Sequence, residues 1–389
     1  MTARSAGAER TPQRAGTIVE GTVDDSTVLF ARGGRRLHVL NESATALWHE
    51  LGRSPTLGRV AATVAEAFGA DVAAVRHDLG ELIERFLADG LLVEEPRSEA
   101  LDAASDRWLR PDPSKPGVPS SGSFEALDAT LRIETDDTEL ATVLDTVLHP
   151  LLVDRPTIAA IRVAPAGADR WEVVSGSGRS VVVGSRLAVA TRALAEVNAA
   201  AVASARDQLV LHAGAVAGDG GAVVLPAPAN HGKSTLTVGL VRAGSGYLTD
   251  EAAAVSSDLI VRPFPKAPAL DPGSFPVFPD LAPALRRGLA EALAETAWHP
   301  DPTLFGTVAD PTPLRAVVFP RWSPGSPTRI TGCDHLDCLS RLLGESFDFA
   351  AGGQVVFDIL TGIVDAVPCY RLVYSELSEA VEIVGRLMA

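Results

Sequence analysis

Apolar and polar residues alternate along three short runs near the start of the chain, and this pattern predicts a small sheet. The runs are TIVEGTV, TVLFAR and RRLHVL. Asp24-Asp25 and Gly33-Gly34 separate them and are typical turn residues. We therefore expect three strands that are joined by tight turns.

Three helices are expected next, because apolar residues then recur three or four positions apart. Asn41 caps the run ESATALWHEL, Pro55 stands in the first turn of the second helix, Asp71 begins the third, and Gly90 ends it. The repeating apolar positions are Val60, Val64 and Phe68 in the second helix and Val72, Val75, Leu79, Leu82, Ile83, Phe86 and Leu87 in the third. Because LLVEE returns as a strand, we predict a winged-helix-like module over residues 17–96.

The rest of the chain predicts a tail, a linker and a larger domain. Residues 1–16 are expected to be disordered, and residues 97–123 contain the Pro- and Ser-rich run RPDPSKPGVPSSGS, which is typical of a linker. Strand patterns (ATLRIET, IAAIRVAP, WEVVSGS, SVVVGS) then mix with a helix over residues 186–205. The predicted fold class is multi-domain α/β, with a mixed α/β domain over residues 124–389.

Composition narrows the classes of partner. The 389 residues are 46% hydrophobic, yet no run of about 18 uninterrupted apolar residues predicts a membrane span. The formal net charge is -15, and no basic stripe predicts nucleic-acid binding. Three cysteines fit a reducing compartment, and the start of the chain has no apolar signal core. We expect a cytoplasmic protein.

The stretch VVLPAPANHGKSTLTVGLV, residues 223–241, predicts a strand, a phosphate-binding loop and a helix. In such a loop, backbone N–H groups surround the β-phosphate, a lysine reaches the β- and γ-phosphates, and a hydroxyl binds Mg²⁺. Ala227 replaces the first glycine of the motif, which alanine can do if its φ is negative. His231 is equally explained as a solvent-facing loop residue. The predicted nucleotide-binding residues of the loop are Ala227, Asn230, His231, Gly232, Lys233, Ser234 and Thr235.

Two segments beside this loop carry candidate catalytic groups. Asp250 and Glu251 stand together at the end of the run GYLTDE, where adjacent carboxylates can divide two tasks, binding Mg²⁺ and taking a proton from an attacking hydroxyl. His212 lies in the apolar run LVLHAGAVA. It is either a packed core residue or a group that reaches the γ-phosphate.

Five further residues have two readings each. Lys266, between prolines, and Arg321, after VVFP, are either contacts for the transferring phosphate or ordinary surface cations. In CDHLDC, Cys333, His335 and Cys338 offer three ligands where a zinc site needs four. The alternative, which we favour, is a helix start with Cys338 buried.

The N-terminal module resembles the pyrroloquinoline quinone biosynthesis protein D (PqqD) family over about eighty residues, in LHVLNESATALW and VRHDLGELIERFLADGLLVEE. The resemblance implies recognition of the leader of a ribosomally made peptide, which adds a strand to the sheet and packs on the third helix. The implied peptide-binding edge is Arg36, Leu37, His38, Val39 and Leu40, and the implied groove wall is Val75, Leu79, Leu82 and Ile83. The alternative is that the apolar residues fill the core, as we expect for Leu82 and Phe86.

The C-terminal domain resembles the HPr serine kinase superfamily, which is related to phosphoenolpyruvate carboxykinase, in LHAGAV, APANHGKST, YLTDE and RPFPKAPALDPGS. The resemblance implies transfer of the γ-phosphoryl group of ATP to a serine, with His212, Lys233 and Asp250 catalytic and ATP and Mg²⁺ as cofactors. The metal ligands would be Ser234 and Glu251. Glu251 and Ala227 depart from the family pattern. Superfamily members often form rings or dimers, and the sequence leaves the oligomeric state open.

These features lead to one functional prediction and two alternatives. We expect an ATP-dependent serine kinase acting on a peptide that its PqqD-like domain recruits, because tethering raises the local concentration of the acceptor. The first alternative is a non-catalytic peptide chaperone or scaffold that serves other maturation enzymes. The second is a nucleotide-dependent transferase other than a kinase.

Overall fold

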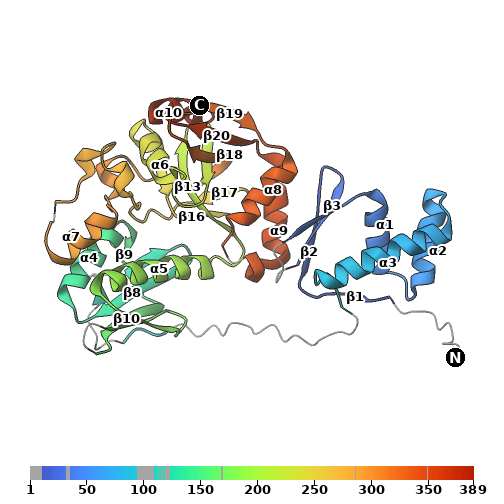
Figure 1. Ribbon diagram of the computed structural model, residues 1–389. Helices are drawn as coiled ribbons and strands as arrows, with labels where there is room; N and C mark the ends of the chain where they lie inside the picture. Colours follow the sequence, from blue (N-terminus) through green and yellow to red (C-terminus); the bar gives the residue numbers. More distant parts are fainter. Residues whose placement is uncertain are drawn as a thin grey trace. The chain divides into compact units, whose positions relative to one another are not determined.

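The computed structural model describes residues 11–31, 36–93, 109–112, 114, 117–118, 123–167, 170–284, 286–347 and 349–389 (Figure 1). The chain divides into two compact units. The N-terminal unit comprises Met1–Ala103 and Phe349–Thr361, and the C-terminal unit comprises Ala104–Asp348 and Gly362–Ala389. Helices and mixed sheets build the fold, which confirms the predicted α/β class.

The predicted three-stranded sheet is present in the N-terminal unit. Strands β2 (Ile18–Val23), β3 (Ser26–Ala31) and β4 (Leu37–Leu40) pair antiparallel in the order β2-β3-β4. The turn between β2 and β3 is at Asp24 and Asp25, whose positive φ angles of 48° and 64° are those of a two-residue hairpin turn. The Gly33-Gly34 turn lies outside the described residues.

Three helices follow at the predicted places: α1 (Glu42–Leu51), α2 (Leu57–Phe68) and α3 (Val72–Ala88). The Asn41 side chain accepts a hydrogen bond from the backbone N–H of residue 44, and Asp71 caps α3 in the same way. Pro55 lies before the cap of α2 and not in its first turn, so that expectation was wrong. Phe68, the last residue of α2, and Val72, the first residue of α3, are exposed. The buried face of each helix does not extend to these terminal residues.

The start of the described chain belongs to the N-terminal unit. Strand β1 (Gln13–Arg14) pairs antiparallel with β5 (Leu92–Val93). Part of the segment expected to be a disordered tail, residues 11–16, is therefore ordered, because the returning strand supplies its hydrogen bonds. Residues 1–10 of that expected tail lie outside the described residues.

The N-terminal unit also includes part of a helix from far along the sequence. Helix α9 (Phe349–Ala366) has a kink at Gly353, and its residues up to Thr361 belong to this unit. A Cβ at Gly21 of β2 would lie 2.8 Å from the Phe357 ring, so the missing side chain lets the helix approach the strand. The expected domain of residues 124–389 therefore contributes one segment to the other unit.

The C-terminal unit contains a first sheet of seven strands. Its order is β12 (Ser180–Val183), β11 (Trp171–Val174), β10 (Ala159–Pro165), β8 (Ala129–Thr135), β7 (Ser123–Ala126) and β9 (Leu152–Val153), and β6 (Gly117–Val118) also pairs with β8. Helices α4 (Thr138–Leu148) and α5 (Arg186–Ser204) share its core. Since β6 falls in the expected linker 97–123, the end of that segment is part of this sheet. Residues 94–108 lie outside the described residues.

The second sheet of this unit positions the candidate site. Its order is β14 (Gly221–Pro226), β13 (Leu209–Gly218), β16 (Ala252–Val255), β17 (Ile260–Arg262), β18 (Thr312–Trp322), β20 (Cys369–Tyr374) and β19 (Arg329–Gly332), with β15 (Gly246–Thr249) paired to β13. Strands β14, β18 and β20 run parallel. Their carboxyl ends therefore meet at one edge of the sheet, where ligands bind in open α/β sheets.

Helices α6 (Lys233–Arg242), α8 (His335–Gly344) and α10 (Leu377–Gly385) accompany this sheet. Helix α7 (Gly288–Thr296) instead contacts α4 and α5 and buries Leu289 and Leu293 in the core of the first sheet. Helix α6 lies close to β13, because a Cβ at Gly214 would touch the Lys233 and Thr237 side chains. Among the described helices, α5 alone has the length and composition to cross a membrane. Five of its side chains, including Val189 and Val197, are fully buried in the core of the first sheet, as in the core helix of a globular domain.

Candidate functional site

The loop between β14 and α6 lies where the motif predicts it. Ala227 is buried and does not take a positive φ, so alanine fits there as the sequence predicted. The left-handed conformations fall at Asn230 (φ 64°) and Gly232 (φ 81°). The strand, the loop and the helix all occur where the motif requires them.

Gly232 is enclosed by two aromatic residues at the start of α6. The Tyr374 hydroxyl donates to the Gly232 carbonyl oxygen at 2.9 Å, and a Cβ on Gly232 would lie 2.9 Å from Cβ of Trp322. No side chain caps α6, so the N–H groups of its first turn stay free of side-chain acceptors. A helix N-terminus in this state favours an anion.

Lys233 begins a chain of three polar side chains. Its Nζ lies 2.7 Å from Nε2 of His212, and Nδ1 of His212 lies 3.2 Å from Oε2 of Glu345. Because the ammonium group only donates, Nε2 accepts and Nδ1–H donates to the carboxylate. Burial, and then the Lys233 charge, lowers the pKa of His212, while burial lowers the pKa of Lys233. His212 is therefore neutral and orients the lysine.

Asp250 directly follows the last residue of β15. Its side chain is buried, and Oδ1 has no hydrogen-bond partner among the described residues. Burial raises its pKa from 3.8 to about 7, against the lowering effects of Lys233 and of a hydrogen bond with Ser234. A buried carboxylate with a free oxygen and a pKa near neutrality is suited to accept a proton or to bind a cation.

Glu251, the neighbouring acid, has a different environment. Its Oε2 lies 3.3 Å from Nζ of Lys266. Burial raises its pKa, but the charges of Lys266 and Lys233 outweigh this effect and hold the pKa below its ordinary value. Lys266 is only 6% exposed, so the alternative of an ordinary surface cation was wrong for this residue. The two adjacent acids are thus held in different protonation environments.

The remaining predicted residues lie around this centre. The Thr235 hydroxyl lies 2.6 Å from that of Ser274, and Nδ1–H of His231 donates to the Ala229 carbonyl oxygen at 3.1 Å. Asn230 is exposed, and Arg321 lines a cavity beside Ala227 and His231.

Two residues near the site were not among the sequence predictions. Glu345 contacts His212 from 133 residues away, and His299 lies close enough to Lys266 for its pKa to respond. Burial, and then the Lys266 charge, lowers the pKa of His299 to about 4. No local pattern marks either residue, because each acts through a partner distant in sequence.

The side chains present fit a magnesium nucleotide. The free N–H groups of the first turn of α6 and the Lys233 ammonium suit phosphate oxygens. The Ser234 hydroxyl, Asp250 with its free Oδ1, and Glu251 supply the oxygen ligands that Mg²⁺ prefers.

The CDHLDC segment forms the start of α8, as the favoured alternative predicted. Asp334 caps the helix, Cys338 is fully buried, and the Cys333 thiol donates to Asp337 at 3.0 Å. Within the described residues, no group of three or more His, Cys, Asp or Glu side chains is placed to hold a metal ion.

The implied peptide-binding surface of the N-terminal unit is only partly available. Val75, Leu79 and Ile83 are buried in the core, so the groove wall assigned to them is largely core packing. Leu82, for which core was the expected role, is partly buried at the margin of the core. The other implied residues lie along β4, where Val39 is 44% exposed and Leu40 is buried.

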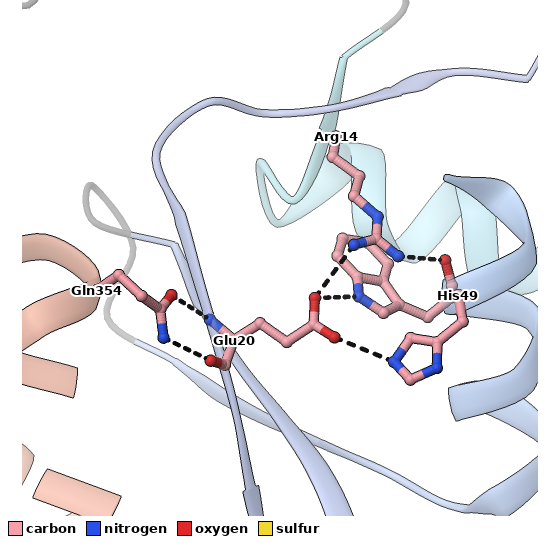
Figure 2. A network of polar contacts seen from close by, with 5 residues as sticks. Arg14, Glu20, His49 and Gln354 are labelled. Carbon is pink, nitrogen blue, oxygen red and sulfur yellow. Dashed lines mark hydrogen bonds and ion pairs between the residues drawn. The ribbon is translucent and has the colours of Figure 1, made fainter. Parts of the chain in front are cut away.

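The other residues of β4 and the segment before it contact α3. Arg36 and His38 both lie near the Asp89 carboxylate, and Leu37 is partly buried. The second edge of the sheet is occupied at Glu20. The Gln354 side chain donates to the Glu20 carbonyl oxygen at 2.7 Å and accepts from its N–H at 3.1 Å, as a neighbouring strand would (Figure 2). Of the two outer strands, β4 therefore keeps a free edge in the described structure.

The Glu20 side chain anchors the same strand to the helices. Its carboxylate accepts hydrogen bonds from Arg14 at 3.1 Å, from Nε1 of Trp48 at 2.9 Å and from His49 at 3.0 Å (Figure 2). The Arg14 guanidinium also stacks on the Trp48 ring at 4.1 Å.

Comparisons with known proteins gave a structural match and a family match. The solved structure of the Hpr(Ser) kinase/phosphatase from Coxiella burnetii is similar to part of this chain, at 15% identity and a TM-score of 0.25, over 46% of this chain and 96% of that one. A search of curated protein sequences finds no match. The family model for Coenzyme PQQ synthesis protein D (PqqD) matches residues 26–92, which span β3, β4, the three helices and the start of β5. Residues 26–92 of the N-terminal unit are therefore a PqqD domain.

Proposed function

We propose that the protein is an ATP-dependent kinase that phosphorylates a serine of a ribosomally made peptide bound by its PqqD domain. The observation that carries the proposal is the group formed by Lys233, His212, Asp250, Glu251 and Lys266 at the start of α6, beside a loop with phosphate-binding geometry. Lys233, Asp250 and Lys266 are buried, and charged groups that are buried together with shifted pKa values are typical of functional sites.

Each residue has a defined task in this proposal. Lys233 and the first turn of α6 bind the β- and γ-phosphates, and His212 fixes the lysine. Ser234 and Glu251 would hold Mg²⁺, which would balance the charge of the ATP phosphates that supply the phosphoryl group. Asp250 takes the proton of the serine hydroxyl as the oxygen attacks the γ-phosphorus of ATP, and the bond between the γ-phosphorus and the β,γ-bridging oxygen breaks so that ADP leaves.

The contact between Ser234 and Asp250 favours an exchange of the two acidic roles. In phosphate-loop enzymes the loop hydroxyl and a neighbouring aspartate hold the metal together. A bound cation would also lower the pKa of Asp250 below the value of the free site. We therefore treat the exchange as the second outcome of the same experiment.

The peptide is proposed to bind by strand addition at β4. Its backbone would pair with the free edge, and the exposed Val39 would contact a side chain of the peptide. The Gln354 amide occupies the opposite edge at Glu20, which leaves β4 as the edge for the peptide in this proposal.

The experiment is single-turnover transfer from MgATP to the peptide encoded beside the gene, with the product located by mass spectrometry. Asp250→Asn should slow transfer about 100-fold or more while MgATP affinity stays within a few-fold. Glu251→Gln should raise the Mg²⁺ requirement and recover part of its rate at high Mg²⁺. His212→Ala should slow transfer less than Asp250→Asn.

Three results would change the assignment. If Asp250→Asn instead raises the Mg²⁺ requirement and Glu251→Gln removes the base, the acids have exchanged roles. If neither change affects transfer, the acids are not catalytic. If the wild type binds no MgATP and transfers nothing, the scaffold is the better account.

A further inference from the structure

The cavity that Arg321 lines opens beside the loop between β14 and α6 in the C-terminal unit, and arginines make up much of its lining. Its volume is about 670 Å³, within the range of ligand sites. Ala227 and His231 of the loop line the cavity, whereas Lys233 and Ser234 do not. Glu345, the residue that contacts His212, also lines it. The cavity therefore adjoins the proposed nucleotide site, but Lys233 and Ser234, the residues proposed to bind the phosphates and the metal, do not line it.

The register of three strands explains why the arginines gather. Arg321 of β18 is paired with Val373 of β20, which is paired in turn with Arg329 of β19. Two residues earlier along β20, Arg371 is paired with Thr331 of β19. Directly paired residues, and residues two apart, project from the same face of a sheet. Alternate positions of β18, β20 and β19 thus present three guanidinium groups to one cavity.

The opposite face of these strands belongs to the core. Val318, Leu372 and Tyr374 are buried there. A shift of one residue in any of the three strands would exchange core and cavity residues, so the core fixes the arginine positions. The arginines are held on a rigid sheet and not on a loop.

The cavity has an excess of positive charge in an acidic protein. The lining includes four arginines, Arg321, Arg329, Arg341 and Arg371, and one carboxylate, Glu345. Glu345 is engaged by His212, and Arg341 is paired with Asp337 at 2.9 Å.

The other arginines are less well neutralised. Arg371 lies 3.9 Å from the same Asp337 carboxylate, and Arg321 and Arg329 have no ion-pair partner within the described part of the chain. The net charge of the whole protein is -15, so a local cluster of uncompensated arginines is not a consequence of composition. Guanidinium groups on adjacent strands suit the bidentate binding of carboxylate or phosphate.

We propose that this arginine pocket binds a carboxylate or phosphate group, and that an acidic segment of the acceptor peptide supplies it. The second clause rests on the proposed kinase function. The volume exceeds what one free anion fills, and the pocket reaches Glu345, whose carboxylate contacts the histidine beside Lys233. The pocket therefore selects serines that have an acidic neighbour.

The first experiment measures the pocket without transfer. Inorganic phosphate is titrated calorimetrically into the full-length Lys233→Ala chain, in which the loop competes less for the anion. Phosphate should still bind, and adding Arg329→Gln should weaken binding at least about ten-fold. Arg315→Gln is the matched control, because Arg315 is exposed on the same strand as Arg321 but lies outside the pocket lining. It should change nothing.

A second comparison keeps the test valid if Lys233→Ala does not fold, as judged by circular dichroism. The wild type then shows two phosphate sites, and Arg329→Gln should remove one of them. Absence of phosphate binding outside the loop, or equal binding by Arg329→Gln and Arg315→Gln, would overturn the pocket.

The second experiment identifies the source of the anion. Two synthetic peptides, identical except that the serine is flanked by glutamate or by glutamine, are compared as acceptors. The glutamate peptide should have a KM at least about ten-fold lower, and Arg329→Gln should close that gap.

Equal KM values with intact phosphate binding would overturn the acceptor assignment and leave a site for a free anion. Phosphate binding without transfer to either peptide would refute the kinase and spare the pocket. Transfer with no gap and no phosphate binding would refute the pocket alone.

Discussion

Replacing Asp250 by asparagine should stabilise the protein, and the gain should depend on pH. Burial raises the pKa of Asp250 from 3.8 to about 7, so the folded chain holds this proton over a range in which the unfolded chain has lost it. The stability of the wild type therefore falls as pH rises from about 4 to about 7 through this group. Asparagine has no proton to lose and removes that dependence.

The magnitude follows from the two pKa values. Each unit of difference corresponds to about 1.4 kcal/mol. The titration of Asp250 therefore lowers the stability of the fold, relative to its value well below pH 4, by about 4 kcal/mol at pH 7 and by about 2 kcal/mol at pH 5. The stability gained by Asp250→Asn should be about 2 kcal/mol larger at pH 7 than at pH 5.

The assay is urea unfolding of wild type and variant without nucleotide, followed by circular dichroism at both pH values. The difference between variant and wild type cancels groups that titrate alike in the two chains. Glu251→Gln is the matched control of opposite sign, because the lysines lower the pKa of Glu251 and its ionised form stabilises the fold. Removing it should destabilise the protein near pH 7, and less so as pH falls. If Asp250→Asn destabilises the protein, or if the stability that it gains is the same at both pH values, the pKa of Asp250 is not raised by burial.

Two further predictions concern the loop and the N-terminal unit. Ala227→Gly should leave the calorimetric affinity for MgATP unchanged or improved, because the backbone at Ala227 has no strain to relieve. Lys233→Ala should weaken that affinity by at least a few-fold. Equal affinities for wild type and Lys233→Ala would mean that the loop does not hold phosphate. Arg14→Ala should destabilise the N-terminal unit by about 1–3 kcal/mol, because it removes charge-assisted hydrogen bonds and the stack on Trp48. Arg53→Ala, an exposed neighbour, should cost within about 0.5 kcal/mol in the same urea titration, and equal losses would contradict the reasoning.

The sequence by itself determined the local elements and the residues that carry a motif. The caps at Asn41 and Asp71, the hairpin at Asp24-Asp25 and the strand, loop and helix around Gly232 were all predictable, because each depends on residues a few positions apart. The negative φ of Ala227 was stated as a condition and is met.

Only the tertiary structure decided what lies between distant segments. Glu345 contacts His212 across 133 residues of sequence, and Gln354 pairs with Glu20 across 334 residues. Hydrophobic periodicity says which face of a helix is apolar but not which surface covers it, so it could not separate core from groove for Leu79 or show that Lys266 is buried. The arginine pocket depends on the pairing of β18, β20 and β19, which no single strand specifies, because register is set by the core that the three strands share.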